Sequence, residues 1–272
     1  MAYTKLIRQQ IAGGQVEEIA STGTYRLTLP AGSNSNYRLA QLDDYAKTPR
    51  RLFSWRSPSS LSLAARASSD SIPGTWGFGL WNYPFGMSLG FSEDGFRLPA
   101  LPNAVWFFHA SKENYLSFRD ASTAPPKNGG SVPRKSAGTS QREVVANGFL
   151  AQTFRAPGFH PLLIPAGLAL PFSRKTTRRL MRRVIGEDGI RLSVDVTQWH
   201  KYRLDWREDR VSFEVDDAPV LESTVSPKAP LGLVIWIDNQ YAAFTPQGKI
   251  GFGVLENPEP AWLEVKDIEV NM

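Results

Sequence analysis

The sequence predicts an all-β protein, an antiparallel sandwich of two sheets with one short helix. Segments that alternate between apolar and polar residues recur along the chain, as in half-buried strands. The 22 Gly and 20 Pro supply the turns that short strands need, and the 8 Trp and 15 Phe are residues that strands favour. No repeat or linker divides the chain, so we expect residues 1–272 to form a single domain.

The first strands are expected in the opening part of the chain. Residues 24–29 alternate with period two between turn clusters at 13–14 and 31–36. Residues 60–67 alternate again, with Leu and Ala on one face and mostly polar residues on the other. Both segments are typical of strands with one buried face.

The middle of the predicted sandwich is more apolar. Residues 75–81 place small residues on one face and large ones on the other, and their glycines leave room for a ligand or another backbone. Residues 103–110 form a nearly continuous apolar run, which predicts a strand buried on both faces. Residues 115–118 are expected to continue this sheet.

An insertion interrupts the strands. The polar segment 121–141, rich in Pro, Gly and Ser, is predicted to be a mobile loop. An apolar and basic insertion follows at 157–186. Its second half, 173–186, is predicted to be a helix that Ser173 caps and Gly186 ends. The arginines are expected to lie outside, opposite an apolar face of Leu180, Met181, Val184 and Ile185.

The last part of the chain contains the clearest hairpin. Residues 202–207 and 211–216 alternate with period two and are joined by a three-residue turn. After a second turn at 216–217, closing strands are expected at 231–237, 249–254 and 262–270.

Three segments resemble family 16 glycoside hydrolases. The hairpin at 199–217 is similar to that family's His-x-Tyr, x-x-x-Trp, aromatic, Val-Asp-Gly hairpin, and residues 73–81 resemble its Gly-Thr-Trp-Pro-Ala-x-Trp strand. Residues 262–270 resemble its closing strand. The resemblance extends from about Leu61 to the C-terminus, with an interruption at 119–190. It implies a concanavalin A-like jelly roll, and a fold alone does not fix a function.

The chain differs from that family in the strand that would hold the catalytic carboxylates. The resemblance places a Glu-x-Asp-x-Glu type strand directly after the Trp strand, because retaining glycosidases need two carboxylates about 5 Å apart. Here the corresponding strand, 103–110, contains no carboxylate, and the nearest acidic residue downstream is Glu113. We therefore expect that the glycosidase mechanism of the family does not operate.

Composition limits the other kinds of site. The absence of Cys excludes thiolate metal sites and Cys nucleophiles, and with three His we expect no metal site and no cofactor. The N-terminus lacks the apolar core of a signal peptide, and no stretch of eighteen apolar residues occurs. These features predict a cytoplasmic protein.

The basic balance of the chain is local. The net charge is +5, but six of the cations lie within ten residues: Arg174, Lys175, Arg178, Arg179, Arg182 and Arg183. The excess of positive charge is therefore a feature of one segment and not of the whole fold, and we expect no nucleic acid partner.

Candidate site residues follow from their places on the predicted strands. His109 ends the carboxylate-free strand and is a candidate acid or base, the alternative being a hydrogen-bonded structural histidine. Asp238 and Tyr241 follow an apolar strand and are the other candidate catalytic residues. Candidate ligand-binding residues are aromatic and amide side chains: Trp76, Trp81, Asn82, Trp106, Trp236, Asn239 and Gln240. Each tryptophan has the core as its alternative place.

The sequence favours non-hydrolytic binding of a glycan or a partly apolar small molecule in an aromatic concave cleft. The alternative is an isomerase, cyclase or lyase in the same cleft, and glycoside hydrolysis is less favoured. The insertion at 157–186 is predicted to be a lid over the cleft, with a dimer contact or a membrane-surface contact through 173–186 as alternatives. The ligand and the oligomeric state are not indicated.

Overall fold

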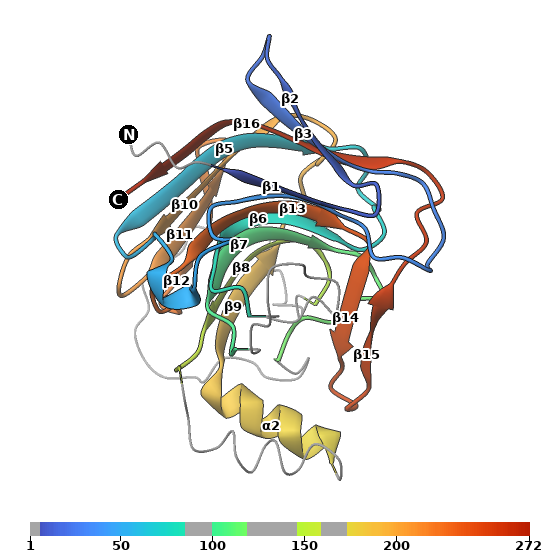
Figure 1. The fold of residues 1–272 in the computed structure, drawn as a ribbon. Coiled ribbons are helices and arrows are strands. Elements are labelled where there is room, and N and C mark those ends of the chain that lie inside the picture. The colour runs from blue at the N-terminus through green and yellow to red at the C-terminus, as the bar shows by residue number, and fades with distance from the viewer. Residues whose placement is uncertain (1–5, 85–99, 119–145, 159–172) are drawn as a thin grey trace.

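The computed structural model describes residues 6–84, 100–118, 146–158 and 173–272. Within these residues, two seven-stranded antiparallel sheets pack face to face, and a separate two-stranded hairpin and one α-helix lie beside them (Figure 1). The predicted all-β sandwich is therefore confirmed.

The first sheet is the one that positions the candidate site. Its strands, in order across the sheet, are β1 (Ile7–Ile11), β4 (Leu39–Asp43), β13 (Gly232–Asp238), β6 (Thr75–Trp81), β7 (Ala104–Ala110), β8 (Gly148–Arg155) and β9 (Gly186–Arg191).

The second sheet covers the first. In order, its strands are β12 (Ala218–Ser223), β11 (Val211–Val215), β10 (His200–Trp206), β5 (Ser59–Ala67), β16 (Ala261–Asn271), β3 (Thr24–Leu29) and β2 (Gln15–Ile19). The remaining elements are the hairpin of β14 (Gln240–Phe244) and β15 (Ile250–Val254), the helix α2 (Arg174–Val184) and a 3-10 turn (Arg50–Leu52).

The main hydrophobic core lies between the two sheets. Along β5, buried residues alternate with half-buried ones, so that Leu61 and Leu63 face the first sheet while Ser60 and Ser62 face outwards. Strand β11 shows the same alternation. This is the period-two pattern from which the strands were predicted.

The three central strands of the first sheet are buried on both faces. Every residue of β6, β7 and β13 is buried. Phe78 and Ile235 belong to the core between the sheets, whereas Trp81 and Trp236 belong to a second hydrophobic cluster on the opposite face. The prediction that 103–110 is buried on both faces is confirmed.

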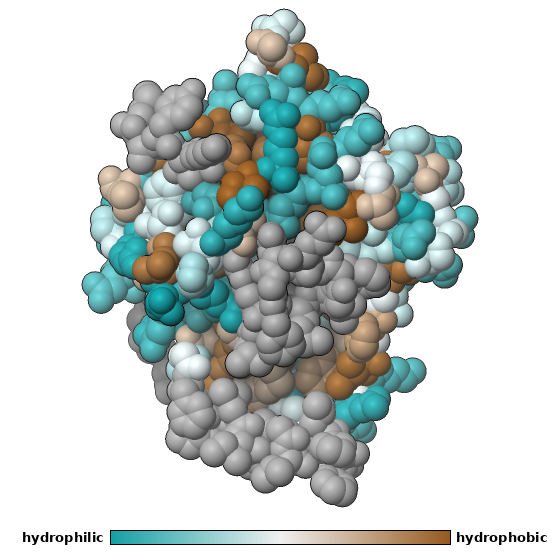
Figure 2. Space-filling model, in the orientation of Figure 1, coloured by the Kyte–Doolittle hydropathy of each residue, from teal (hydrophilic) through white to brown (hydrophobic). Residues whose placement is uncertain are grey.

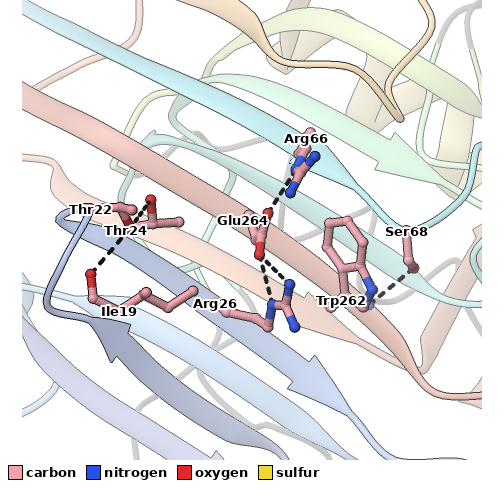
Figure 3. A network of polar contacts seen from close by, with 8 residues as sticks. All are labelled: Ile19, Thr22, Thr24, Arg26, Arg66, Ser68, Trp262 and Glu264. Atoms are coloured by element: carbon pink, nitrogen blue, oxygen red, sulfur yellow. Dashed lines mark hydrogen bonds and ion pairs between the residues drawn. The ribbon is translucent and has the colours of Figure 1, made fainter.

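The outer face of the second sheet is held by a cross-strand ion pair network (Figure 3). Glu264 on β16 stands directly between Arg26 on β3 and Arg66 on β5. Its Oε1 is 2.5 Å from an Arg26 nitrogen and its Oε2 is 2.7 Å from Arg66 Nε. Glu264 is only 2% exposed, and two cations compensate its buried charge. Both arginines also lie over the ring of Trp262, at 5.1 and 5.5 Å from its centroid.

The β10–β11 hairpin and the turn after it are confirmed. Asp216 and Asp217 have φ values of 51° and 63°, the left-handed conformation that such tight turns require. The Asp216 carboxylate also lies 2.6 Å from Nδ1 of His200 and ties the ends of the two strands together.

Some predicted elements differ from the structure. Residues 115–118 do not form a strand, and Tyr115 makes only an isolated bridge to Ala243. Strands β8, β9, β12 and β14 are present although no alternating pattern predicted them. The predicted loop 121–141 and most of the apolar half of the insertion lie outside the described residues.

The predicted helix is present, but it ends at Val184, and Gly186, which was expected to end it, is the first residue of β9. Ser173 caps it by accepting the backbone N–H of Thr176, and Met181 and Ile185 pack on the second hydrophobic cluster. Not all the arginines lie outside, however, because Arg178 is 3% exposed. Among the described residues, no helix is both long and apolar enough to cross a membrane.

Candidate functional site

A cavity of about 650 Å³ opens on the face of the first sheet that points away from the second sheet. Strands β13, β6 and β7 form its floor, β1 and β4 form one side, and the start of β14 lies at its edge. In Figure 2, hydrophobic residues are visible in the hollow below the sandwich, on the side where Figure 1 shows helix α2.

Two glycines explain why the floor of the cavity holds such large rings. Gly77 pairs with Trp236 across β6 and β13, and Gly79 pairs with Trp106 across β6 and β7. A Cβ at Gly77 would lie 2.9 Å from the Trp236 ring, and one at Gly79 would lie 2.5 Å from Trp106 Cβ. The glycines of residues 75–81 thus make room for two indoles, where the sequence had predicted a ligand or another backbone.

Three tryptophans form the floor. The rings of Trp81 and Trp236 are stacked with centroids 5.7 Å apart and an interplanar angle of 9°, and Trp106 lies 5.8 Å from each. Each indole N–H is used inside the protein. The acceptors are the Tyr45 hydroxyl at 2.7 Å for Trp81, Gln152 Oε1 at 3.3 Å for Trp106, and the Thr75 hydroxyl at 2.9 Å for Trp236. These bonds fix the rings, so the floor offers aromatic carbon surface rather than hydrogen-bond donors.

One buried carboxylate stands at the edge of this floor. Asp238, the last residue of β13, is 6% exposed. Its Oδ1 accepts the Thr75 hydroxyl at 2.7 Å and the Gln240 backbone N–H at 3.2 Å, and its Oδ2 accepts the Tyr37 hydroxyl at 3.4 Å. Because Thr75 also accepts from Trp236, the carboxylate is linked to the aromatic floor.

Burial decides the ionisation of the acid. It raises the pKa of the Asp238 carboxyl to about 7, although the hydrogen bonds from Thr75, Gln240 and Tyr37 act in the other direction. Burial, with the charge of Asp238, raises the pKa of Tyr37 well above its usual value. Asp238 can therefore gain or lose a proton near neutral pH, whereas Tyr37 stays a phenol that donates a hydrogen bond.

The strand that the resemblance makes catalytic carries no acid on the cavity side. Trp106 and Phe108 of β7 line the cavity, and Ala110 belongs to the same hydrophobic cluster. Among the described residues that line the cavity, Asp238 is the only carboxylate. A retaining or inverting glycosidase needs two.

The structure brings most of the predicted site residues together. Six of them line the cavity: Trp81, Trp106, Trp236, Asp238, Gln240 and Tyr241.

Two predicted residues lie on the other side of the sheet. Trp76 belongs to the core between the sheets, and His109 stacks on it with ring centroids 5.3 Å apart. His109 Nε2 lies 3.1 Å from the carbonyl oxygen of Asp70, and burial lowers the pKa of its imidazole to about 4. The expectation that Trp76 and His109 face the cleft is therefore wrong, because successive residues of a strand point to opposite faces.

Two predicted amides make structural hydrogen bonds instead. Asn82 donates to the carbonyl of Leu101 and accepts the N–H of Asn103. Asn239, which is fully buried, accepts the N–H of Arg38 and donates to two backbone carbonyls. Neither lines the cavity.

Sequence reasoning missed Tyr37 and Thr75, the two side chains that contact the acid. Thr75 shares its face of β6 with Gly77, Gly79 and Trp81, a period-two signal that was available. Tyr37 lies 201 residues before Asp238, and no local pattern connects them.

No protein-family model and no curated protein sequence matches this chain. Solved structures that resemble it include a β-glucanase of Bacillus licheniformis, with 9% identity and a TM-score of 0.45 over 100% of this chain and 94% of that one. A glycoside hydrolase family protein of Mycobacterium thermorestibile has 12% identity and a TM-score of 0.47, over 100% of this chain and 94% of that one. A putative β-glucanase of Mycobacterium abscessus has 9% identity and a TM-score of 0.48, over 98% of this chain and 92% of that one. These likenesses are too distant to assign an activity to this chain.

Proposed function

We propose that the protein binds a ring-bearing, largely uncharged ligand in this cavity, either a glycan or a partly apolar small molecule, and does not hydrolyse glycosides. The observation that supports this most is the floor of three tryptophans beside a single carboxylate. Aromatic faces hold sugar rings and apolar rings through their carbon surface. A cavity of about 650 Å³ has the size of a small-molecule site.

The proposal excludes hydrolysis because the cavity lacks the second acid. Asp238 can supply one proton, but among the described lining residues no second carboxylate stands opposite it to act as nucleophile or general base. On β7, the strand on which the family resemblance expects the carboxylates, the residues that line the cavity are Trp106 and Phe108.

Acid–base catalysis without hydrolysis is the second candidate. It is favoured by the pKa of about 7 that burial gives Asp238 and by the phenol of Tyr37 beside it. A group that titrates near the working pH is suited to move a proton on a bound substrate. An isomerase, cyclase or lyase would need Asp238 for turnover, whereas a binding protein would need the tryptophans alone.

Calorimetric titration tests the proposal. The probes are β-1,3- and β-1,4-linked gluco-oligosaccharides and a neutral bicyclic alcohol, 2-naphthol. We expect saturable binding of at least one probe, and about tenfold weaker binding by Trp236→Phe, because a smaller ring leaves part of the stacking surface unfilled. Trp262→Phe, on the outer face of the second sheet, is the matched control and should bind normally. Equal loss of affinity in both variants, or no loss in either, would contradict the placement of the site.

A further inference from the structure

The charge of helix α2 is unusual for a helix that is only part of a fold. It carries six cations and no acid in eleven residues. The whole chain has a net charge of +5, so the rest of the chain has one more acidic than basic residue. The basic character of this protein is therefore the property of one helix.

This arrangement costs helix stability. Arg174 and Lys175 lie in the first turn, where the helix dipole disfavours cations and where no acid is present. Cations also recur four residues apart, as in Lys175 with Arg179 and Arg179 with Arg183, and such like-charge pairs destabilise a helix. A local cost of this kind, at exposed positions, points to a use outside the helix.

One of the cations, Arg178, has a structural role that the described contacts explain. Arg178 is 3% exposed and donates to the carbonyl oxygens of Ser117, at 2.6 Å, and Phe244. Its guanidinium lies 5.3 Å from the ring centroid of Tyr115 and 5.5 Å from that of Phe244. Arg178 thus holds one face of helix α2 against the protein, and the opposite face of the helix points outwards.

Other cations of the helix are exposed, and one more lies on the hairpin whose turn contacts the first turn of the helix. Arg174, Lys175, Arg179 and Arg183 are exposed, and no acid of the described residues pairs with any of them. The turn of the β14–β15 hairpin lies against the start of the helix (Figure 1), where a Cβ at Gly248 would be 3.1 Å from Lys175. The next residue, Lys249, is also exposed. We call these five cations the basic face.

The β14–β15 hairpin, which carries Lys249, also exposes apolar side chains. Ile250 and Phe252 on β15 are 39% and 61% exposed. Ile250 pairs directly with Phe244, the residue whose carbonyl accepts from Arg178. Cations next to exposed apolar side chains suit the boundary between anionic head groups and acyl chains.

We propose that the basic face, with Ile250 and Phe252, docks the protein onto an anionic lipid bilayer. The cations would lie among the head groups, and the two apolar side chains would enter the acyl boundary. This surface is separate from the cavity, since none of its residues lines it. The inference therefore does not depend on the proposed ligand.

Co-sedimentation with vesicles tests the proposal on the full-length protein. One set of vesicles is phosphatidylcholine alone, and the other contains 30% phosphatidylserine. We expect binding to the anionic vesicles only, weakened at 500 mM salt. The triple change Arg174→Gln, Arg179→Gln and Arg183→Gln should lower the affinity on the order of 100-fold, from about 1 kcal/mol for each cation near the surface. Phe252→Ser should lower it about tenfold.

A matched variant separates this surface from net charge. Arg51→Gln, Arg207→Gln and Lys228→Gln remove three exposed cations elsewhere and should leave vesicle binding nearly unchanged. Circular dichroism checks that each variant is folded. The proposal is overturned if the wild type does not bind anionic vesicles at low salt, or if both triple variants lose affinity equally. Tighter binding of a mixed-sequence RNA than of the vesicles, at the same salt, would overturn the choice of a membrane as partner.

Discussion

The buried carboxyl of Asp238 makes the stability of the protein depend on pH, and Asp238→Asn is expected to remove that dependence. Asn keeps the shape of the side chain and an oxygen that can accept from Thr75 and Gln240. It cannot ionise. The comparison of the two proteins therefore isolates the free energy of placing a negative charge at this position.

The sign and size follow from the pKa. Burial raises the pKa of Asp238 from 3.8 to about 7, so the folded state holds its proton more tightly than the unfolded state. The resulting stability is fully present below the unfolded pKa and is lost as the pH rises through about 7. A difference of about three pKa units at 1.36 kcal/mol per unit gives about 4 kcal/mol. The free energy of unfolding of Asp238→Asn, relative to wild type, should rise by about this amount from pH 4 to pH 8.

Urea denaturation at pH 4, 5, 6, 7 and 8 measures this difference. Burial also raises the pKa of Asp44 to about 6 and lowers that of His109 to about 4, but both proteins contain these groups, so their effects cancel in the difference. A difference between Asp238→Asn and wild type that stays flat from pH 4 to pH 8 would refute the raised pKa.

Three further changes test the packing around the site and the second sheet. Because burial lowers the pKa of His109 to about 4, the free energy of unfolding of the wild type should fall by about 3 kcal/mol between pH 6.5 and pH 4. His109→Gln should remove this fall, and an unchanged acid transition would contradict the lowered pKa. Glu264→Gln should lower the free energy of unfolding by about 1–3 kcal/mol, because two arginines lose their shared buried anion, and a loss no larger than that of Arg66→Gln would count against it. Gly79→Ala should lower the free energy of unfolding by about 1–3 kcal/mol, because its Cβ would lie 2.4 Å from a carbonyl oxygen. Gly186→Ala is the control, because its Cβ would meet nothing closer than 3.5 Å. Equal urea midpoints of the two variants would contradict the clash.

Alternation in the sequence was sufficient to find strands that have one buried face. Among these, β3 has the predicted bounds, and β5 begins one residue earlier than expected. Strand β6, which is buried on both faces, also has its predicted bounds, because small residues on one face oppose large ones on the other. Strand β9 shows no regular alternation of apolar and polar residues, because most of its side chains are not buried in the core. Its position is set by pairing with β8 rather than by its own residues.

The faces of the central strands were harder to predict. Residues 104–110 are apolar on both faces, so composition does not distinguish the side of His109 from the side of Trp106. The spacing of Trp106 and His109 does distinguish the two sides, because residues three apart on a strand point in opposite directions. The same parity separates Trp76 from Trp81, which are five apart.

Contacts between distant segments could not be predicted at all. Arg178 was expected to lie in solvent with the other arginines, because helical periodicity shows only which residues share a face. Its burial depends on carbonyl oxygens and rings supplied by residues 115–118 and 244. The contact of Tyr37 with Asp238 is of the same kind.

Binding without hydrolysis can be tested directly on the wild-type protein. Each probe, β-1,3- and β-1,4-linked gluco-oligosaccharides and 2-naphthol, is titrated by calorimetry, and the release of reducing ends is followed with the oligosaccharides. We expect saturable binding of at least one probe and no reducing ends above a blank. Reducing ends that accumulate with the wild type and disappear with Asp238→Asn would contradict this expectation.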